Sequence, residues 1–194
     1  RQLKTTRDDS AILQDLGYTF DPVGNITQIS DGAQQALFYD DEFVAPTCQY
    51  AYDALYRLVS ATGREHVSVG DVQVDNNDQP IRALPLPNTP GAVRNYTEEY
   101  TYDRIGNILQ MFHDAGSGAA TWTRDYTYIS GKNWLDTTSA PGSPVSYSHD
   151  VHGNMTAMPH LASIGYSPFD QMQHADLGGG GDAYYVYDGS GNRV

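Results

Sequence analysis

A short motif recurs along this chain, and it constrains the fold more than any other feature of the sequence. The clearest copy is the stretch YTYDRIGNI, which runs from Tyr100 to Ile108. Because residues i and i+2 of a β-strand share a face, Tyr100 and Tyr102 are predicted to lie on one side of a sheet. Aspartate is favoured at the first position of a type I turn and glycine at the fourth, as in Asp103 and Gly106. The stretch therefore predicts a β-hairpin whose return strand begins at Ile108.

Five clear copies of the motif lie between residues 18 and 194. Their motif residues are Tyr18, Asp21 and Gly24; Tyr50, Tyr52 and Asp53; Tyr100, Tyr102, Asp103 and Gly106; Tyr147, Asp150 and Gly153; and Tyr185, Tyr187, Asp188 and Gly191. In the second copy Tyr56-Arg57 stands where the others have Gly-Asn, which leaves the geometry of that turn open. Degenerate copies begin at Tyr126 and Tyr166, so from position 100 the copies start 26, 21, 19 and 19 residues apart. A period of about 20 residues is typical of a stacked array with one hairpin per repeat.

The repeat predicts an all-β fold in which antiparallel β-hairpin repeats form a twisted ribbon. Residues 1–17 are expected to be a strand or lead-in, residues 38–42 an acidic segment between two repeats, and residues 178–181 a flexible hairpin tip. Residues 64–95 break the pattern, because they contain the turn-rich stretch DNNDQP and the proline-rich stretch LPLPNTPG. We expect a long surface loop there. A polyproline ligand at Leu84-Pro-Leu-Pro is the alternative interpretation.

Charge and composition exclude several classes of function. The formal net charge is −13, whereas nucleic-acid binding requires a basic surface, so no nucleic-acid partner is expected. The 15 tyrosines can bury their rings and keep their hydroxyl groups at a wet edge, which suits a sheet that is not covered on both faces. The single Cys48 cannot form an internal disulfide and is expected to be a small buried residue or an incidental thiol, not a nucleophile. No apolar run approaches the ~20 residues of a membrane-spanning helix, and no signal peptide is recognisable.

The residues that could act as metal ligands or catalysts are better explained by structural roles. His149, His152, His160 and His174 form a loose cluster near Asp150, but a zinc site needs three or four converging ligands, and the first of these histidines merely replaces the second tyrosine of its repeat. The acidic stretch 75–78 lacks the glycine and the glutamate of an EF-hand loop. No phosphate-binding loop or nucleophile elbow occurs. We therefore expect no catalytic residue, no cofactor and no bound metal.

The pattern Tyr-x-Tyr-Asp-x-x-Gly-Asn/Arg-hydrophobic resembles the YD repeat of RHS-repeat proteins, a family that includes shell-forming subunits of toxin complexes, polymorphic bacterial toxins and teneurins. The resemblance extends from about Tyr18 to Val194, and the stretch GNMTAMPHL from Gly153 is most similar to bacterial members. It implies a β-ribbon wound into a hollow shell around a toxic polypeptide. Shells of this family also contain an aspartate-based self-cleavage region with Asp-Pro-x-Gly. Here Asp21-Pro-Val-Gly lies in the first repeat, at the repeat's own aspartate position, so a turn is expected instead.

These observations predict that residues 1–194 are a YD-repeat β region and a segment of a longer protein, since the chain starts at Arg1 and its last repeat stops at Val194 before a return strand. The resemblance implies a structural, non-enzymatic role in a secreted or extracellular protein, with the rest of the parent chain and its cargo polypeptide as partners. The alternative is a secreted carbohydrate- or protein-binding β module, with Trp122 and Trp134 as a platform for glycans. Unpaired strand edges would also favour a homodimer of the isolated segment.

Overall fold

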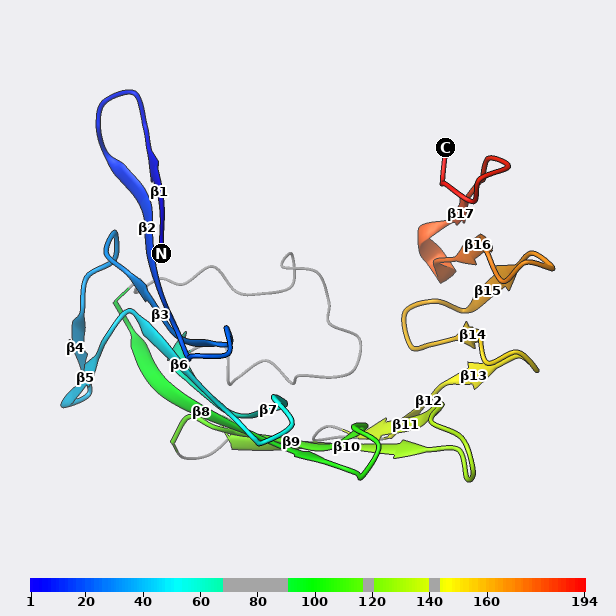
Figure 1. Ribbon diagram of the computed structural model, residues 1–194, viewed down its shortest axis with the longest axis horizontal. Helices are drawn as coiled ribbons and strands as arrows, with labels where there is room; N and C mark the ends of the chain where they lie inside the picture. Colours follow the sequence, from blue (N-terminus) through cyan, green and yellow to red (C-terminus); the bar gives the residue numbers. More distant parts are fainter. Residues whose placement is uncertain (68–90, 117–120, 140–143) are drawn as a thin grey trace. The chain divides into compact units, whose positions relative to one another are not determined.

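The computed structural model describes residues 1–67, 91–116, 121–139 and 144–194, and the regular secondary structure of these residues is almost entirely β-strand (Figure 1). The strands are β1 (Gln2–Thr6), β2 (Ile12–Phe20), β3 (Ile26–Asp31), β4 (Leu37–Tyr39), β5 (Glu42–Val44), β6 (Thr47–Tyr52), β7 (Leu58–His66), β8 (Val93–Tyr102), β9 (Ile108–Asp114), β10 (Thr121–Tyr128), β11 (Leu135–Ser139), β12 (Val145–Ser146), β13 (Ser148–His149), β14 (Met155–Ala157), β15 (Ser163–Tyr166), β16 (Met172–Asp176) and β17 (Asp182–Tyr184). The predicted all-β, antiparallel class is confirmed.

Within each sheet, hydrogen-bonded neighbours follow one another in the chain, as expected for a series of hairpins, except that β3 pairs with β6. The largest sheet has the order β1-β2-β3-β6-β7-β8-β9-β10-β11-β12, and smaller sheets pair β13 with β14, β15 with β16 and β17, and β4 with β5. The hairpin of β8 and β9 is the one predicted from YTYDRIGNI, with Tyr100 opposite Met111 and Tyr102 opposite Ile108. By compactness the chain divides into two units, Arg1–Gln73 with Gln79–Thr123, and Val74–Asp78 with Arg124–Val194.

Tyrosine side chains lie over small residues on one face of the first unit's sheet. Tyr96 of β8 pairs with Gly63 of β7, and a Cβ atom built on this glycine would lie 2.7 Å from the tyrosine hydroxyl. The ring therefore rests directly on the backbone of the neighbouring strand. The buried hydrophobic side chains of this unit are also small, namely Val44, Ala61, Ala92 and Ala115. Large aromatic rings thus cover a sheet that has no second layer of helices among the described residues.

The proline-rich loop is shorter than the predicted range 64–95 at both ends. Strand β7 continues to His66 and β8 begins at Val93, and these two residues face each other in the ladder. An ion pair between Arg94 and Glu65 fixes the same pair of strand ends, with 2.7 Å between nitrogen and oxygen. Residues 68–90, including the Leu84-Pro-Leu-Pro stretch, lie outside the described residues.

Three further segments refine the predictions. The lead-in over residues 1–17 is a hairpin, because β1 pairs with β2 around a turn closed by a bond from the Ser10 amide to the Arg7 carbonyl at 2.8 Å. The acidic segment 38–42 is also a hairpin, formed by β4 and β5. The glycine-rich tip between β16 and β17 is a short 3₁₀ helix, Gly178–Gly180, whose first amide donates to the Asp176 carboxylate at 2.8 Å.

Candidate functional site

The aspartate of each clear repeat organises its own turn. At Asp103, one carboxylate oxygen accepts the backbone N–H groups of Ile105 and Asn107, both at 2.9 Å. The other oxygen accepts the Asn107 side-chain amide at 2.9 Å. Gly106 takes the fourth position with φ of +98°, a value that suits glycine. The predicted turn cap is therefore present, and the asparagine after the glycine completes it, a role that the spacing alone did not assign.

The second repeat forms the same turn without glycine. Tyr56 occupies the fourth position with φ of +63°, and its amide donates to the Asp53 carbonyl at 3.0 Å, so the geometry left open by the sequence is the geometry of the other turns. Arg57 replaces the asparagine, pairing with the Asp53 carboxylate at 2.7 Å. Its guanidinium also donates to the Asp103 carbonyl at 3.0 Å and lies 4.8 Å from the ring centre of Tyr102. Arg57 thus bonds its own turn and the next repeat at once.

In the degenerate copy at Tyr166, the sequence suggests that Asp170 is the repeat aspartate, but the turn begins three residues earlier. Ser167 stands at the aspartate position, because its hydroxyl accepts the amides of Phe169 and Gln171 at 3.2 and 3.3 Å. Asp170 stands at the glycine position, with φ of +58°. Aspartate tolerates this conformation better than most residues. The carboxylate of Asp170 is therefore released from capping and pairs with His152 of the preceding turn at 2.7 Å.

Tyrosine hydroxyl groups connect successive repeats at equivalent positions. In each case the donor is the tyrosine that directly precedes the first residue of a turn. The acceptor is a backbone carbonyl in the preceding repeat, five positions after the first residue of that repeat's turn. The donor and acceptor pairs are Tyr52 and Ile26, Tyr102 and Leu58, and Tyr166 and Met155, with oxygen–oxygen distances of 2.9, 2.7 and 2.9 Å. We call this bond the tyrosine latch. Because the acceptor lies on the neighbouring strand, each latch fixes one repeat against the one before it.

The turn bonds also change the acidity of the aspartates. For Asp53 the backbone amide of Arg57, and then its guanidinium, hold the pKa of the carboxyl below its usual value. For Asp150 the side-chain amide of Asn154 is the main cause of the lowered pKa. At Asp103 partial burial raises the pKa, but the bonds from the Asn107 amides outweigh it and the net shift is downward. Hydrogen bonds to the charged form are the common physical cause.

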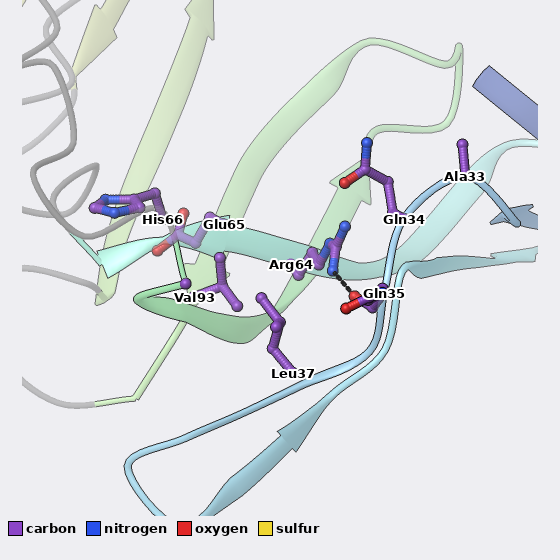
Figure 2. A pocket seen from close by; sticks show the side chains of 9 residues that line it. Ala33, Gln34, Gln35, Leu37, Arg64, Glu65, His66 and Val93 are labelled. Atoms are coloured by element: carbon purple, nitrogen blue, oxygen red, sulfur yellow. Dashed lines mark hydrogen bonds between the residues drawn. The ribbon is translucent and has the colours of Figure 1, made fainter. Parts of the chain in front are cut away.

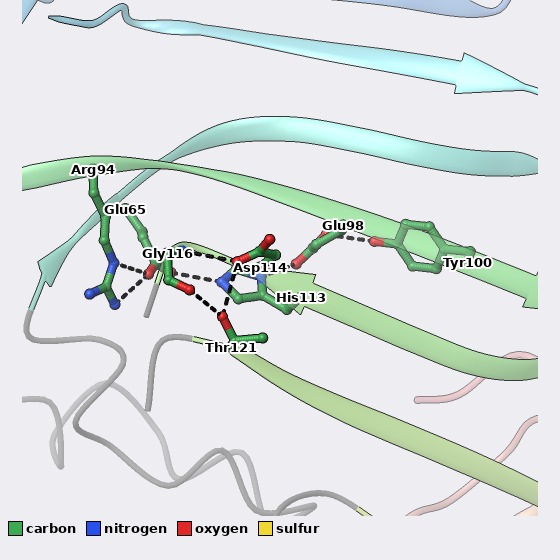
Figure 3. A network of polar contacts seen from close by, with 8 residues as sticks. All are labelled: Glu65, Arg94, Glu98, Tyr100, His113, Asp114, Gly116 and Thr121. Carbon is green, nitrogen blue, oxygen red and sulfur yellow. Dashed lines mark hydrogen bonds and ion pairs between the residues drawn. The ribbon is translucent and has the colours of Figure 1, made fainter. Parts of the chain in front are cut away.

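A buried polar network occupies the tyrosine-covered face of the first unit (Figure 3). His113 is 5% exposed, and its Nδ1 and Nε2 atoms lie 3.1 Å from Glu98 and 3.3 Å from Glu65. Both contacts can be hydrogen bonds only when both ring nitrogens carry a hydrogen, since a neutral imidazole has one donor. Arg94 pairs with Glu65, and the Tyr100 hydroxyl donates to Glu98 at 2.7 Å. The network joins β7, β8 and β9 through charged groups that are each partnered.

Aromatic rings enclose the centre of this network. The His113 ring is stacked between Tyr96 and Trp122, with ring centres 5.0 and 4.9 Å apart. Burial, followed by the charge of Glu98, raises the pKa of Tyr96 to about 12. Burial and the bond to Glu98 likewise raise the pKa of Tyr100. Beside the stack, Asp114 accepts bonds from the Gly116 amide and the Thr121 hydroxyl, both at 3.0 Å. The sequence predicted other roles for Tyr100 and Trp122 but did not predict this cluster, because its members come from four strands.

The two tryptophans are poor candidates for a sugar platform. One face of Trp122 is covered by the His113 ring. Trp134 is stacked on His149 at 5.6 Å, and the Lys132 ammonium lies 3.4 Å from its ring centre. A Cβ atom at Gly153 would lie 2.7 Å from the same indole, so backbone packs against it as well. Sugar recognition needs an accessible ring face; Trp134 is covered by several groups of its own repeats, and Trp122 has one face in use.

The histidines do not converge on a metal in the described part of the chain. His152 pairs with Asp170, and His174 pairs with Asp182 at 2.8 Å, so each has its own carboxylate partner. No group of three or more suitable ligands occurs among the described residues. At Asp21 the carboxylate accepts the amides of Val23, Gly24 and Asn25 at 2.8–3.0 Å, which is the arrangement of a turn. No described helix is long and apolar enough to cross a membrane.

A depression with a volume of about 530 Å³ lies at the base of the β4–β5 hairpin (Figure 2). Leu37 and Val93 form part of its wall, and the Arg64 guanidinium donates to the Gln35 carbonyl at 3.0 Å across one side. The lining contains no serine, threonine or cysteine that could act as a nucleophile. We therefore assign no catalytic role to this depression.

Comparison with known proteins finds relatives of this chain, although no protein-family model matches it. Toxin subunit YenC2 of Yersinia entomophaga is 32% identical over 190 residues, covering 94% of this chain and 19% of that protein. Toxin subunit YenC1 of the same organism is 36% identical over 116 residues, covering 60% of this chain and 11% of that protein. The chain thus spans about a fifth of the length of one of these relatives and about a tenth of the other.

Solved structures give the same result. The crystal structure of TcdB2-TccC3-Cdc42 matches the whole chain with a TM-score of 0.71 and 29% identity, over 9% of its own length. The Tc holotoxin pore of Photorhabdus luminescens matches 99% of the chain with a TM-score of 0.68 and 28% identity, also over 9% of its length. The resemblance implied by the repeats is confirmed: the chain is an RHS/YD-repeat β segment, homologous to part of the toxin subunits YenC2 and YenC1.

Proposed function

We propose that this chain is a structural segment of an RHS-type shell that encloses or presents a toxin polypeptide. The observation that carries the proposal is the tyrosine latch, which recurs at equivalent positions in successive repeats of a chain homologous to toxin subunits. A wall needs each repeat to be fixed to its neighbour. The latch, the Asp-capped turns and the Arg57 contact between repeats all serve this end.

The same contacts support a role without catalysis. The turn aspartates are occupied by amides of their own turns, and a pair of carboxylates acting as an acid and a base would have to face each other. The cluster around His113 is charged, but its central ring is 5% exposed and stacked between two aromatic rings. A substrate could not reach it without separating the strands. We infer that its role is to hold β7, β8 and β9 together.

The proposal also assigns partners and place. In the whole protein the segment would contact neighbouring repeats of its own chain and the enclosed polypeptide, and the protein would act outside the cell that makes it. Both inferences rest on the homology to toxin subunits.

The test uses the full-length protein that carries this segment. Electron microscopy should show a hollow β-shell with enclosed density, and the enclosed polypeptide should resist trypsin. Removing three latch hydroxyls with Tyr52→Phe, Tyr102→Phe and Tyr166→Phe should speed its digestion. The matched control changes three exposed tyrosines whose hydroxyl groups make no hydrogen bond within the described residues, Tyr39→Phe, Tyr56→Phe and Tyr184→Phe, and should leave digestion unchanged. A solid or extended particle, or equal digestion rates in both variants, would overturn the proposal.

A further inference from the structure

Among the described residues of the first unit, the β4–β5 hairpin is the one hairpin that lies outside the main sheet, and the repeats do not explain it. Strands β3 and β6 pair directly with each other, so the hairpin between them is an insertion that forms its own two-stranded sheet (Figure 1). Its turn consists of Asp40 and Asp41, both with positive φ, at 50° and 62°. Positive φ at both central residues is the type I′ geometry that matches the twist of a tight hairpin. The element is therefore rigidly built.

One face of this hairpin is anchored to the sheet. Val44 is fully buried, and it pairs with Leu37 on the same face of the hairpin. The side-chain amide of Asn95 in β8 donates to the Glu42 carboxylate at 2.8 Å and to the Phe43 carbonyl at 3.1 Å. These contacts fix the position of the hairpin against β8.

The opposite face carries two exposed phenylalanines. Phe38 and Phe43 are cross-strand partners, with ring centres 5.6 Å apart and exposed fractions of 76% and 55%. Other exposed apolar side chains, such as Ile105 and Phe169, stand singly at the third position of a repeat turn and so belong to the repeat. A paired aromatic surface on a fixed hairpin is different, because contiguous exposed apolar surface marks interaction sites.

Acidic groups border this aromatic pair. Asp40, Asp41 and Glu42 follow one another at the tip, and all three are exposed. In the described part of the chain, the carboxylates of Asp40 and Asp41 make no hydrogen bond or ion pair. Most other acidic clusters of the first unit are partnered, as Glu65 and Glu98 are by Arg94 and His113. The tip therefore presents apolar rings beside two unpartnered negative charges.

We propose that the outer face of the β4–β5 hairpin docks a basic, apolar segment of another polypeptide. A leucine-like side chain of that segment would cover the pair of rings, and a lysine or arginine would pair with Asp40 and Asp41 or lie over a ring. Charge favours a polypeptide over a membrane, because biological membranes are neutral or anionic and would repel the acidic tip. This surface is distinct from the latches and goes beyond a role as wall material.

Fluorine NMR tests the proposal, because the chain has only five phenylalanines. The protein is labelled with 4-fluorophenylalanine, and the five signals are assigned with single Phe→Leu variants. The probe is a 12-residue peptide of alternating lysine and leucine. We expect the Phe38 and Phe43 signals to shift together and saturably, while the signal of Phe169, which is 83% exposed, stays in place. A glutamate–leucine peptide and phosphatidylcholine vesicles should shift neither signal.

Two variants test the charges. Asp40→Asn with Asp41→Asn keeps residues that tolerate positive φ and should weaken peptide binding at least tenfold. The control, Asp8→Asn with Asp136→Asn, makes the same change in net charge elsewhere and should leave the affinity unchanged. Three results would each overturn the proposal: shifts at Phe169 as large as those at the hairpin, equal losses of affinity in both variants, or shifts caused by vesicles and not by the peptide.

Discussion

Tyr56 shows how a single residue can keep a turn that its side chain disfavours. A tyrosine at φ of +63° is strained, because its Cβ approaches the following carbonyl oxygen. The turn persists because Asp53 caps it and Arg57 bonds both this carboxylate and the next repeat. The strain is local, whereas the bonds that offset it reach into the neighbouring hairpin.

Relieving that strain should stabilise the protein. Tyr56→Gly should raise the free energy of unfolding by about 1 kcal/mol, since glycine adopts this conformation without a Cβ contact and the tyrosine ring is 60% exposed. Thermal unfolding followed by circular dichroism measures the change. Ala54→Gly in the same turn is the control and should destabilise. If both variants lower the melting temperature, the turn is not strained at residue 56.

Replacing His113 is expected to lower the free energy of unfolding strongly. His113→Leu leaves the side chains of Glu65 and Glu98 buried without their shared partner, which should cost about 3 kcal/mol. Glu65 keeps its ion pair with Arg94, whereas Glu98 loses its ion-pair partner, so adding Glu98→Gln removes that uncompensated charge and should recover part of the loss. Urea unfolding of the two single variants and the double variant measures the coupling. Strictly additive effects would show that the histidine and the carboxylate do not act together.

At the residue scale, the sequence predicted what depends on spacing within one turn. Asp103 and Gly106 take the predicted roles because a turn is decided by four consecutive residues. The cluster around His113 was not predicted, since it depends on the register of strands that lie far apart in the chain. Sequence alternation says which residues share a face, but not which of them meet.

In three repeats, one tyrosine hydroxyl finds its hydrogen-bond acceptor in the neighbouring repeat. The hydroxyl of Tyr102 bonds the Leu58 carbonyl at the start of β7, and the two residues are 44 positions apart in the chain. Because the bond joins two defined positions, it can form in only one register of β8 against β7. The latch is therefore a device for register as well as for stability.

Removing one latch should have a measurable effect. Tyr102→Phe deletes the donor and leaves the Leu58 carbonyl without this bond, so the free energy of unfolding should fall by about 1 kcal/mol. Tyr39→Phe is the matched control and should change it by less than about 0.5 kcal/mol, because this side chain lies outside the latches. Equal losses would mean that the ring and not the hydroxyl carries the contact. Hydrogen exchange at Leu58 and its neighbours would locate the effect.

At the element scale, the sequence predicted the hairpins that follow the repeat consensus. It did not predict the hairpins in which another residue type takes a consensus position. Ser167 caps like an aspartate, which moves the turn by three residues and places Asp170 at the glycine position. The β4–β5 hairpin was predicted only as an acidic segment, because its aspartates are not followed by glycine. Type I′ turns prefer Asn-Gly and Asp-Gly, so Asp-Asp gives a weaker signal.

Across the whole molecule, the same carboxylate is used in every clear repeat, and this links stability to pH. Asp21, Asp53, Asp103, Asp150 and Asp188 all have a pKa below the usual value in the folded protein. A lowered folded pKa contributes stability that is present above the unfolded value, near 3.8, and is lost as pH falls through the folded pKa. His152 has the opposite sign: Asp170 raises its pKa, so its contribution is present in mild acid and is lost as pH rises.

We therefore expect the melting temperature to fall steeply below about pH 4, with a small decline above neutrality. Acid also reduces the net charge of −13, which alone would stabilise the fold by lowering repulsion. Measurements in 0.5 M NaCl screen this repulsion and isolate the contribution of the turns. Asp53→Asn with Asp103→Asn should lower the melting temperature at pH 7 but reduce the fall in acid, because two of the titrating caps are gone. If the fall below pH 4 is as large in this variant as in the unchanged chain, other carboxylates control it, and the repeat turns do not set the acid limit of the protein.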